Sequence, residues 1–321
     1  RHGTGAPPGS AYSFRTVCDK TPARKRRFSD PLPTWPASQE FRRPEPMAWS
    51  QFLADAYAKP SNVDWCEANY VSLDWVAEAW NTFSSVPMTI VAFYGFYRAR
   101  QHLPMCKTEQ RWAMAWGLLG VVGVGSALFH ATLRHVFQAA DELPMLYCNL
   151  IFVYLMLEEG SGRTHAPRKR WLAPLLAAAG VVQTLCYFIF PTVYAIFLTS
   201  YLSVIVWLVW RSTRLAWFHP DATPLQRTLC RTALLFYLGG SALWVFENAV
   251  CGVHGEGGGG WPLQWAHLHA LWHLGACMGT YHFIEFNAAR RGAALGMNVR
   301  AGGGASLLMP LYVIHELPKI K

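Results

Sequence analysis

The chain has 321 residues, of which 52% are hydrophobic and only 15% are charged. Soluble domains carry roughly 25% charged residues, so this composition is typical of an integral membrane protein, and the length suits one polytopic domain. The formal net charge of +9 is unevenly spread, because residues 1–46 hold nine Lys or Arg against four Asp or Glu. With no soluble basic domain in the sequence, we expect no binding of nucleic acid.

The N-terminal segment differs in composition from the rest of the chain. Residues 1–50 are rich in Pro and Ser and show no hydrophobic period, so we predict a disordered basic tail there. Residues 51–290 are predicted to form the membrane domain, and residues 291–321 a C-terminal tail.

Seven apolar segments follow one another along the membrane domain. Each has about 20 residues, the length that a helix needs to cross about 30 Å of hydrocarbon. They lie near residues 79–98, 112–133, 140–158, 171–190, 192–210, 229–250 and 264–286. We therefore predict an all-α fold, a bundle of seven transmembrane helices.

The loops between these segments predict how the bundle is oriented. Lys and Arg are concentrated in loops 98–111, 159–170 and 211–228 and after the last span, whereas Arg134 alone lies in a loop on the opposite side. Because short cytosolic loops carry an excess of Lys and Arg, we expect a cytosolic C-terminus and a lumenal or extracellular N-terminus. An endoplasmic reticulum or Golgi membrane is the expected location.

Polar residues inside the spans gather toward the non-cytosolic side. Ser126 and His130 lie four residues apart at the end of the second span, and His269 and His273 have the same spacing at the start of the last span. Four residues is just over one helical turn, so each pair points from one helix face. Asp141 begins the third span on the same side. We therefore expect these five residues to converge inside the bundle.

This set of residues is typical of a metal-dependent hydrolytic site. Three neutral imidazoles are a complete protein ligand set for a catalytic zinc ion. The fourth position then holds a water molecule whose pKa is lowered to about 7. Asp141 is placed to transfer a proton, and Ser126 to bond an oxyanion or a ligand. The HxxxH pair alone is also compatible with a packing or hydrogen-bonding pair. The third histidine and the nearby aspartate favour a metal site.

A second polar cluster precedes the first span. The segment "DWCEANY" (residues 64–70) and Glu78 offer side-chain oxygens, and Trp65 offers a backbone carbonyl. Calcium prefers six to eight such oxygens, but the spacing is not that of an EF-hand. On spacing alone, a solvated acidic loop with a helix cap is the favoured interpretation.

The eight cysteines include no CxxC pair, so a thiolate zinc site is not indicated. Cys66 and Cys251 lie just outside the first and sixth predicted spans, on the non-cytosolic side. That side is oxidising, so either a disulfide between them or two free thiols is compatible with the sequence.

Six segments of the sequence, in this order, resemble the alkaline ceramidase family over about residues 55–290. They are "DWCEANY", "AEAWNTFSSVPM", "GVGSALFHATL", "DELPMLY", "LWVFENAVC" and "HALWH". The resemblance implies seven transmembrane helices and hydrolysis of the amide bond of ceramide to a sphingoid base and a fatty acid. It implies zinc at His130, His269 and His273, with Ser126 and Asp141 completing the site.

The resemblance also implies a calcium site, which reverses the preference for a solvated loop, and a disulfide between Cys66 and Cys251. The implied calcium ligands are Asp64, Trp65, Glu67, Asn69 and Glu78. The expected partners are a ceramide or phytoceramide substrate and membrane lipids, with no obligate protein partner. Two alternatives are a related membrane hydrolase that cleaves an ester in a phospholipid or glycolipid, and a non-enzymatic seven-helix receptor or transporter.

Overall fold

A computed structural model describes most of the membrane domain. The described residues are 54, 57–102, 110–159, 169–190, 192, 194–251, 265–302 and 312–316. All of them fall in the larger of the two units into which the chain divides, Ala48–Lys321. The predicted N-terminal tail, residues 1–50, lies outside the described residues.

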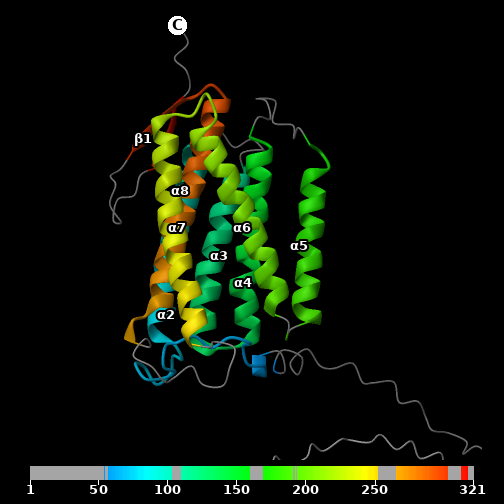
Figure 1. The fold of residues 1–321 in the computed structure, drawn as a ribbon, viewed down its shortest axis with the longest axis vertical. Coiled ribbons are helices and arrows are strands. Elements are labelled where there is room, and N and C mark those ends of the chain that lie inside the picture. The colour runs from blue at the N-terminus through cyan, green and yellow to red at the C-terminus, as the bar shows by residue number, and fades with distance from the viewer. Residues whose placement is uncertain are drawn as a thin grey trace, which may run out of the picture. The chain divides into compact units, whose positions relative to one another are not determined.

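Long α-helices make up most of the described structure (Figure 1). They are α2 (Ala79–His102), α3 (Gln110–Thr132), α4 (His135–Leu157), α5 (Leu172–Ile189), α6 (Tyr194–Trp217), α7 (Pro224–Cys251) and α8 (Leu268–Ala294). Each overlaps one predicted span, and α2, α4, α6, α7 and α8 extend four or more residues past a predicted limit. An antiparallel hairpin of β1 (Asn298–Gly302) and β2 (Tyr312–Glu316) follows α8, within the segment that was predicted as a tail.

The helices differ in how apolar they are. Among the described residues, the five helices α3 to α7 are long and apolar enough to cross a membrane. The helices α2 and α8 are less apolar, since each carries polar residues of the site described below and charged residues at its other end. Large side chains such as Val181, Val206 and Leu235 are 59%, 68% and 68% exposed on α5, α6 and α7. An apolar surface of this kind suits contact with lipid.

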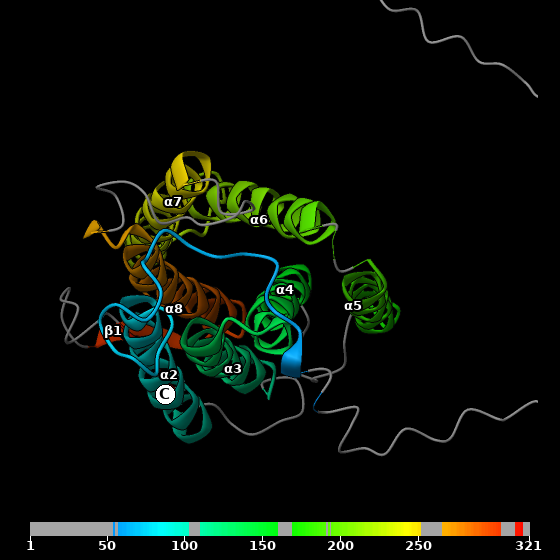
Figure 2. The ribbon, with the colours of Figure 1, turned by 90° about the horizontal axis from the view of Figure 1, so that it is seen from below.

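Helix α8 packs against α7, α2 and α3, and most of its side chains are buried (Figure 2). Glycine allows its close approach to α7. A Cβ atom at Gly275 would lie 2.8 Å from the carbonyl oxygen of Phe236 and 3.0 Å from the Cα atom of Gly240. Small residues at such crossings let helix backbones approach in a membrane. Helix α5 lies at the edge of the bundle, where Leu172, Gly180 and Tyr187 are its buried residues.

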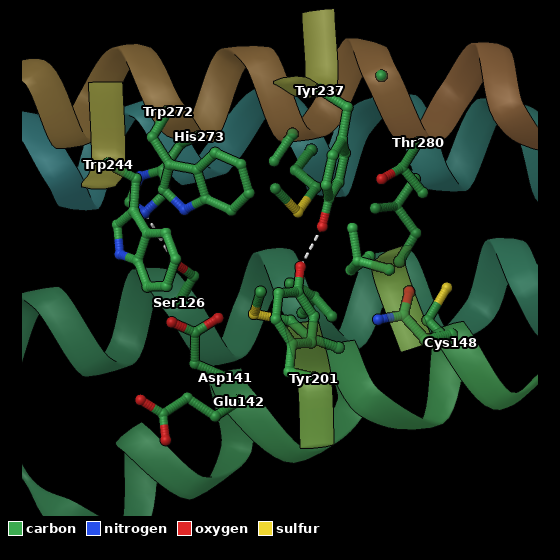
Figure 3. Close-up of a pocket in the computed structure, with 18 of the residues that line it drawn as sticks. Ser126, Asp141, Glu142, Cys148, Tyr201, Tyr237, Trp244, Trp272, His273 and Thr280 are labelled. Atoms are coloured by element: carbon green, nitrogen blue, oxygen red, sulfur yellow. Dashed lines mark hydrogen bonds between the residues drawn. The ribbon is translucent and has the colours of Figure 1, made fainter. Parts of the chain in front are cut away.

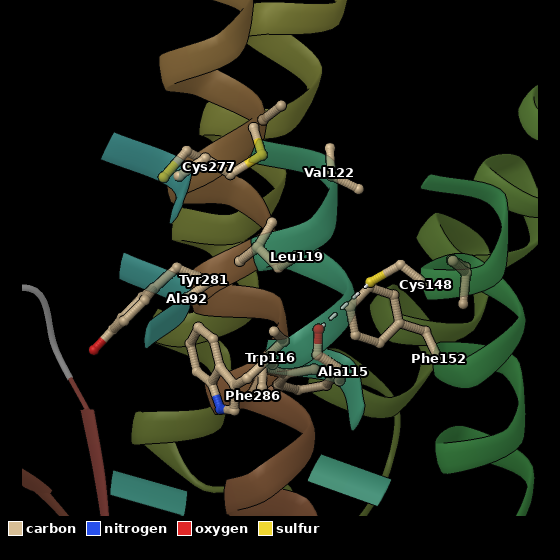
Figure 4. Close-up of a cluster of buried hydrophobic side chains, with 14 of the residues drawn as sticks. Ala92, Ala115, Trp116, Leu119, Val122, Cys148, Phe152, Cys277, Tyr281 and Phe286 are labelled. Carbon is tan, nitrogen blue, oxygen red and sulfur yellow. Dashed lines mark hydrogen bonds between the residues drawn. The ribbon is translucent and has the colours of Figure 1, made fainter. Parts of the chain in front are cut away.

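Part of the apolar core lies between α2, α3, α4 and α8 (Figure 4). Trp116 and Leu119 of α3 lie there with Phe152 of α4 and with Tyr281 and Phe286 of α8. The rings of Trp116 and Tyr281 meet edge to face, with centroids 5.3 Å apart. This packing fixes α8 against α3, and so fixes the polar ends of both helices.

Ion pairs tie the helix ends at the far side of that core. Arg98 of α2 donates to Glu285 of α8 at 3.1 Å. The Nε atom of Arg290 donates to Glu159, just after α4, at 2.9 Å, and Arg291 donates to the backbone carbonyl of Glu159 at 3.0 Å. This end of the bundle is therefore rich in arginine.

The segment before α2, residues 57–78, crosses the opposite end of the bundle, and we call it the strap (Figure 2). Its backbone bonds to the turn between α3 and α4: Ser61 N–H donates to Leu133 O at 2.9 Å, and His135 N–H donates to Lys59 O at 3.0 Å. Leu133 has a φ of 49°, so α3 ends abruptly and α4 begins two residues later. The strap and this tight turn hold the ends of α3 and α4 together.

Candidate metal centre

Three buried histidines meet where the C-terminal end of α3 faces the N-terminal end of α8. His130, His269 and His273 are at most 4% exposed, and one ligand atom from each lies within 4.8 Å of the others. Their ring centroids are 4.6–5.0 Å apart. The structure thus brings together the three predicted zinc ligands in a cluster that could hold a metal ion.

The second nitrogen of two of these rings already has a partner. His130 Nδ1 contacts the Glu78 carboxylate. His273 Nδ1 lies 2.8 Å from Ser84 Oγ and 3.1 Å from Asn81 O. Metal-binding histidines almost always bond through their other ring nitrogen in this way, which sets the tautomer and the ring orientation.

The other ring nitrogen of His130, Nε2, is also consistent with a metal ligand. Its Nε2 atom is buried and has no hydrogen-bond partner among the described residues. An unsatisfied buried polar atom costs about 1–3 kcal/mol, and a metal ion would satisfy it. Three neutral imidazoles also match the chemistry of a catalytic zinc site, so the residues fit the metal.

Ser126 and Asp141 lie beside the histidines, as predicted (Figure 3). Ser126 Oγ accepts a hydrogen bond from Ser85 Oγ at 3.1 Å and lies 3.4 Å from His273 Nε2. The Asp141 carboxylate accepts a hydrogen bond from the Ser126 hydroxyl and interacts electrostatically with His130. A carboxylate, a hydroxyl and a metal-binding group therefore face the same space.

A glycine allows Asp141 to reach this position. Gly125 precedes Ser126 on α3, and a Cβ atom there would overlap the carbonyl oxygen of Ala140 and lie 2.9 Å from Asp141 N. No residue larger than glycine fits without moving α4. The close approach of α3 and α4 thus sets the separation of Ser126 and Asp141.

A long pocket leads away from the histidines (Figure 3). It holds about 1190 Å³ of unfilled space, including its open part, and its lining is mostly apolar. Ligand pockets with mostly apolar walls bind apolar molecules, so the lining of this pocket suits an apolar ligand. A hydrogen bond between Tyr201 of α6 and Tyr237 of α7 crosses the pocket, and Cys148 and Thr280 lie beyond it.

Aromatic side chains enclose the end of the pocket that holds the histidines. Trp65 of the strap stacks on His269, with ring centroids 3.9 Å apart, and lies 6.3 Å from the ring of Trp244. Trp244 stacks in turn on Trp272, at 5.9 Å. The strap is thus part of the wall of the site.

The predicted calcium ligands all lie in the strap. Asn69 Nδ2 donates to both carboxylate oxygens of Asp64, at 3.0 and 3.1 Å. Glu67 accepts backbone N–H groups at the start of α2, at 2.7 and 2.9 Å, and so caps that helix. Glu78 Oε1 accepts the backbone N–H of Trp65 at 3.0 Å.

The electrostatics of this cluster favour a cation. Burial raises the pKa of Asp64 and of Glu67, and the nearby Glu78 carboxylate raises both further. Within the described part of the chain, no Lys or Arg forms an ion pair with either carboxylate. Asn69 Oδ1 is also buried without a partner there. Oxygen atoms of this kind are the ligands that calcium prefers, and here the carboxylates already accept N–H groups of the strap and of α2.

A disulfide joins Cys66 of the strap to Cys251 at the end of α7. The two Cα atoms are 5.7 Å apart and the residues are separated by 185 positions in the sequence. The bond attaches the strap to the bundle next to Trp65 and Glu67.

Several residues at the centre were not assigned by the sequence analysis. Asn81 and Ser84 of α2 contact His273, and Ser85 of α2 contacts Ser126. Their spacing of three and four residues in an otherwise apolar span was the available signal. Glu78 was predicted only as a calcium ligand, yet it also contacts His130, and Glu247 lies near His269.

Comparison with known proteins adds an independent result. A family model described as Ceramidase matches residues 58–299. Alkaline ceramidase 3 of Mus musculus is 32% identical over 251 residues, covering 72% of this chain and 84% of the relative. The alkaline ceramidase of Arabidopsis thaliana is 26% identical over 260 residues (81% and 94%), and alkaline ceramidase YPC1 of Saccharomyces cerevisiae is 27% identical over 251 residues (70% and 74%). The matched region includes nearly all of the strap and every helix from α2 to α8.

Proposed function

The chain belongs to the ceramidase family, whose curated members are named alkaline ceramidases, and from this premise we propose that it hydrolyses the amide bond of ceramide. The products are a sphingoid base and a free fatty acid. The observation that carries the proposal is the cluster of three buried histidines at the head of a long, apolar pocket.

Two metal ions are part of the proposal. His130, His269 and His273 would hold zinc, which when bound polarises the amide carbonyl and lowers the pKa of water to about 7. Calcium would be held in the strap, where it would fix this segment against the bundle. The proposed calcium ligands are Asp64, the Trp65 carbonyl, Glu67, Asn69 and Glu78.

Asp141 is the proposed general base and general acid. Its carboxylate accepts a proton from the attacking water as the new C–O bond forms at the carbonyl carbon. It then delivers that proton to the amide nitrogen as the C–N bond breaks, so that the sphingoid base leaves as an amine. Asp141 suits both steps because it faces Ser126 and His130 at the head of the pocket.

Ser126 is the proposed donor to the oxyanion. In the structure its hydroxyl donates to Asp141 and accepts from Ser85. With substrate in place, the hydroxyl would turn to the carbonyl oxygen, on which negative charge develops as water attacks. A donor aimed at developing charge in a site that excludes water stabilises the transition state.

The pocket and the apolar outer surface explain why this reaction occurs inside a membrane protein. The pocket walls are mostly apolar, so they can bury the alkyl chains of a ceramide or phytoceramide and exclude water around the amide. Large exposed apolar side chains on α5, α6 and α7 would face lipid, from which the substrate would come. All seven helices, α2 to α8, would span the membrane, with the N-terminus in the lumen of the endoplasmic reticulum or Golgi.

The test is a hydrolysis assay with detergent-purified protein and a panel of labelled ceramides and phytoceramides at mildly alkaline pH. We expect release of sphingoid base that stops when zinc is chelated and returns when zinc is added. A phospholipid and a glycolipid ester serve as comparison substrates. Cleavage of these esters, with no release from any ceramide while zinc is bound, would contradict the proposal.

A further inference from the structure

Two buried polar atoms face each other without hydrogen bonds at the junction of α7 and α8. Oε2 of Glu247 lies 3.4 Å from Nδ1 of His269, and the two side chains are only 2% and 5% exposed. Neither atom has a hydrogen-bond partner among the described residues. Both a buried carboxylate and a buried imidazole N–H require a partner, so each is the natural partner of the other.

His269 differs from the other two histidines in the partner of its Nδ1 atom. His130 Nδ1 meets a carboxylate, and His273 Nδ1 meets a hydroxyl and a backbone carbonyl. His269 is the member of the cluster whose Nδ1 lacks a completed bond in the described structure. A small rotation of either side chain would shorten the 3.4 Å separation to an ordinary hydrogen bond.

We propose that Glu247 is a positioning residue for the metal centre: its carboxylate accepts the Nδ1–H of His269 and thereby presents the Nε2 lone pair of His269 to the metal. The inference rests on the metal centre of the proposed function. It assigns to α7 a role in a site whose three histidines come from α3 and α8.

The surroundings of Glu247 hold it in place for this role. It lies one helical turn before Cys251, whose disulfide with Cys66 anchors the strap. The Cys66 backbone N–H donates to the Glu247 carboxylate. On the other side, Trp65 stacks on the His269 ring. The Trp65 indole therefore fixes the plane of the His269 ring, and the Glu247 carboxylate faces its Nδ1 edge. Both groups lie close in sequence to the Cys66–Cys251 disulfide.

The geometry favours positioning over direct ligation. The group of atoms that lie within 4.8 Å of one another contains the three histidines and does not include Glu247. A carboxylate behind a metal-bound imidazole raises the basicity of the ligand and fixes its tautomer. Loss of such a partner lowers metal affinity by about 10- to 100-fold.

The test measures metal binding rather than activity. Wild type, Glu247→Gln and Glu247→Leu are purified, and zinc content and zinc affinity are measured by elemental analysis and by competition with a chelator. We expect affinity to fall about 10-fold in Glu247→Gln, which keeps an acceptor but loses the charge, and about 100-fold in Glu247→Leu. The visible absorption of the cobalt-substituted protein should change in both variants, because the geometry around the ion relaxes.

The matched control is Glu158→Gln. Glu158 is a glutamate with the same 1% exposure as Glu247, but it lies after α4, at the arginine-rich end of the bundle. The zinc affinity and cobalt spectrum of the Glu158→Gln variant should equal those of wild type. The thermal unfolding midpoint of each metal-free variant shows whether the fold is intact, and Glu247→Gln carries the test if Glu247→Leu does not fold.

Three results would overturn the inference. Unchanged zinc affinity in both folded Glu247 variants would refute it and leave the proposed function standing. Loss of zinc as complete as in His269→Ala would make Glu247 a ligand instead. Absence of zinc from active wild-type protein would remove the metal centre itself, and with it the metal part of the proposed function.

Discussion

Glu78 shows how much one side chain does in this protein. Its Oε1 atom accepts the backbone N–H of Trp65 in the strap, and its Oε2 atom contacts both Asn81 Nδ2 and His130 Nδ1. The same carboxylate therefore belongs to the acidic cluster and contacts a histidine of the candidate metal centre. A shift of the strap would therefore move the carboxylate that contacts His130.

At the residue scale, the histidines are the first target. His269→Ala is expected to abolish ceramide hydrolysis and zinc binding, because two imidazoles do not complete the ligand set of a catalytic zinc ion. Hydrolysis and zinc content of purified protein are measured. His282→Ala, on the same helix and with the same 4% exposure, is the control and should retain zinc, since His282 bonds to the backbone of Met278 instead. Full activity of His269→Ala would refute the zinc centre.

Asp141 is expected to affect catalysis and not metal binding. Asp141→Asn cannot accept the proton of the attacking water, so kcat should fall by about 10²- to 10⁴-fold while zinc content stays at the wild-type value. Single-turnover rates and elemental analysis of the same sample separate the two effects. A variant that lost zinc as well would show that Asp141 is a ligand, and one that kept its rate would remove it from the mechanism.

At the scale of elements, the crossing of α3 and α4 sets the separation of Ser126 and Asp141, the two residues proposed to act in catalysis. Gly125→Ala is expected to push α4 away from α3, because a Cβ atom there would overlap the carbonyl oxygen of Ala140. Overpacking of this kind costs about 1–3 kcal/mol of stability, and a 1 Å displacement at a catalytic group can lower the rate about 100-fold. Thermal unfolding in detergent and the hydrolysis rate are measured.

Gly117→Ala is the control for this prediction. Gly117 lies on the same helix, but a Cβ atom there would meet nothing within 4 Å. Its substitution should leave activity unchanged and stability equal or slightly higher, since alanine is favoured over glycine in a helix by about 0.5–1 kcal/mol. Equal behaviour of the two variants would contradict the role given to Gly125.

The disulfide is the second feature at this scale. Replacement of Cys66 and Cys251 together by Ser is expected to lower the free energy of unfolding by about 2–4 kcal/mol, because the bond closes a long loop in the unfolded chain. Thermal unfolding should show a lower midpoint. The hydrolysis rate should also fall, because the strap would no longer be held against His269. Cys186→Ser removes a thiol with no disulfide in the structure and should change neither quantity.

At the scale of the whole molecule, the two ends of the bundle differ in charge. The histidine cluster and the strap lie at one end. The ion pairs of Arg98 and Arg290, and the hydrogen bond of Arg291 to a backbone carbonyl, lie at the other. By the positive-inside rule, we expect the arginine-rich end to face the cytosol. The amide of the substrate would then be cleaved on the lumenal side, and the disulfide would lie on the oxidising side.

A topology assay tests this orientation. A reporter fused after Lys321 should be digested by protease added to sealed microsomes, and an N-glycosylation acceptor placed there should stay unmodified. The same acceptor placed before residue 57 should be glycosylated. The reverse pattern would invert the bundle and place the metal centre on the cytosolic side.

The sequence by itself determined the helices, and it predicted which residues lie together at the histidine cluster. Apolar runs must match the thickness of the hydrocarbon, so seven segments were predicted near the observed α2 to α8. Helical spacing put Ser126 with His130 and His269 with His273, because residues four apart share a face. The hairpin of β1 and β2 was missed, since two five-residue strands give little periodic signal.

Only the tertiary structure decided which groups support each histidine. Glu78 and His130 are 52 residues apart, and Ser84 and His273 are 189 apart, so no local pattern joins them. Glu247 reaches His269 only because α7 and α8 approach closely at Gly240 and Gly275. Local spacing determines the face of one helix on which a side chain lies. The packing of several helices determines what that face meets, and here it determines the contacts at the second nitrogen of each histidine.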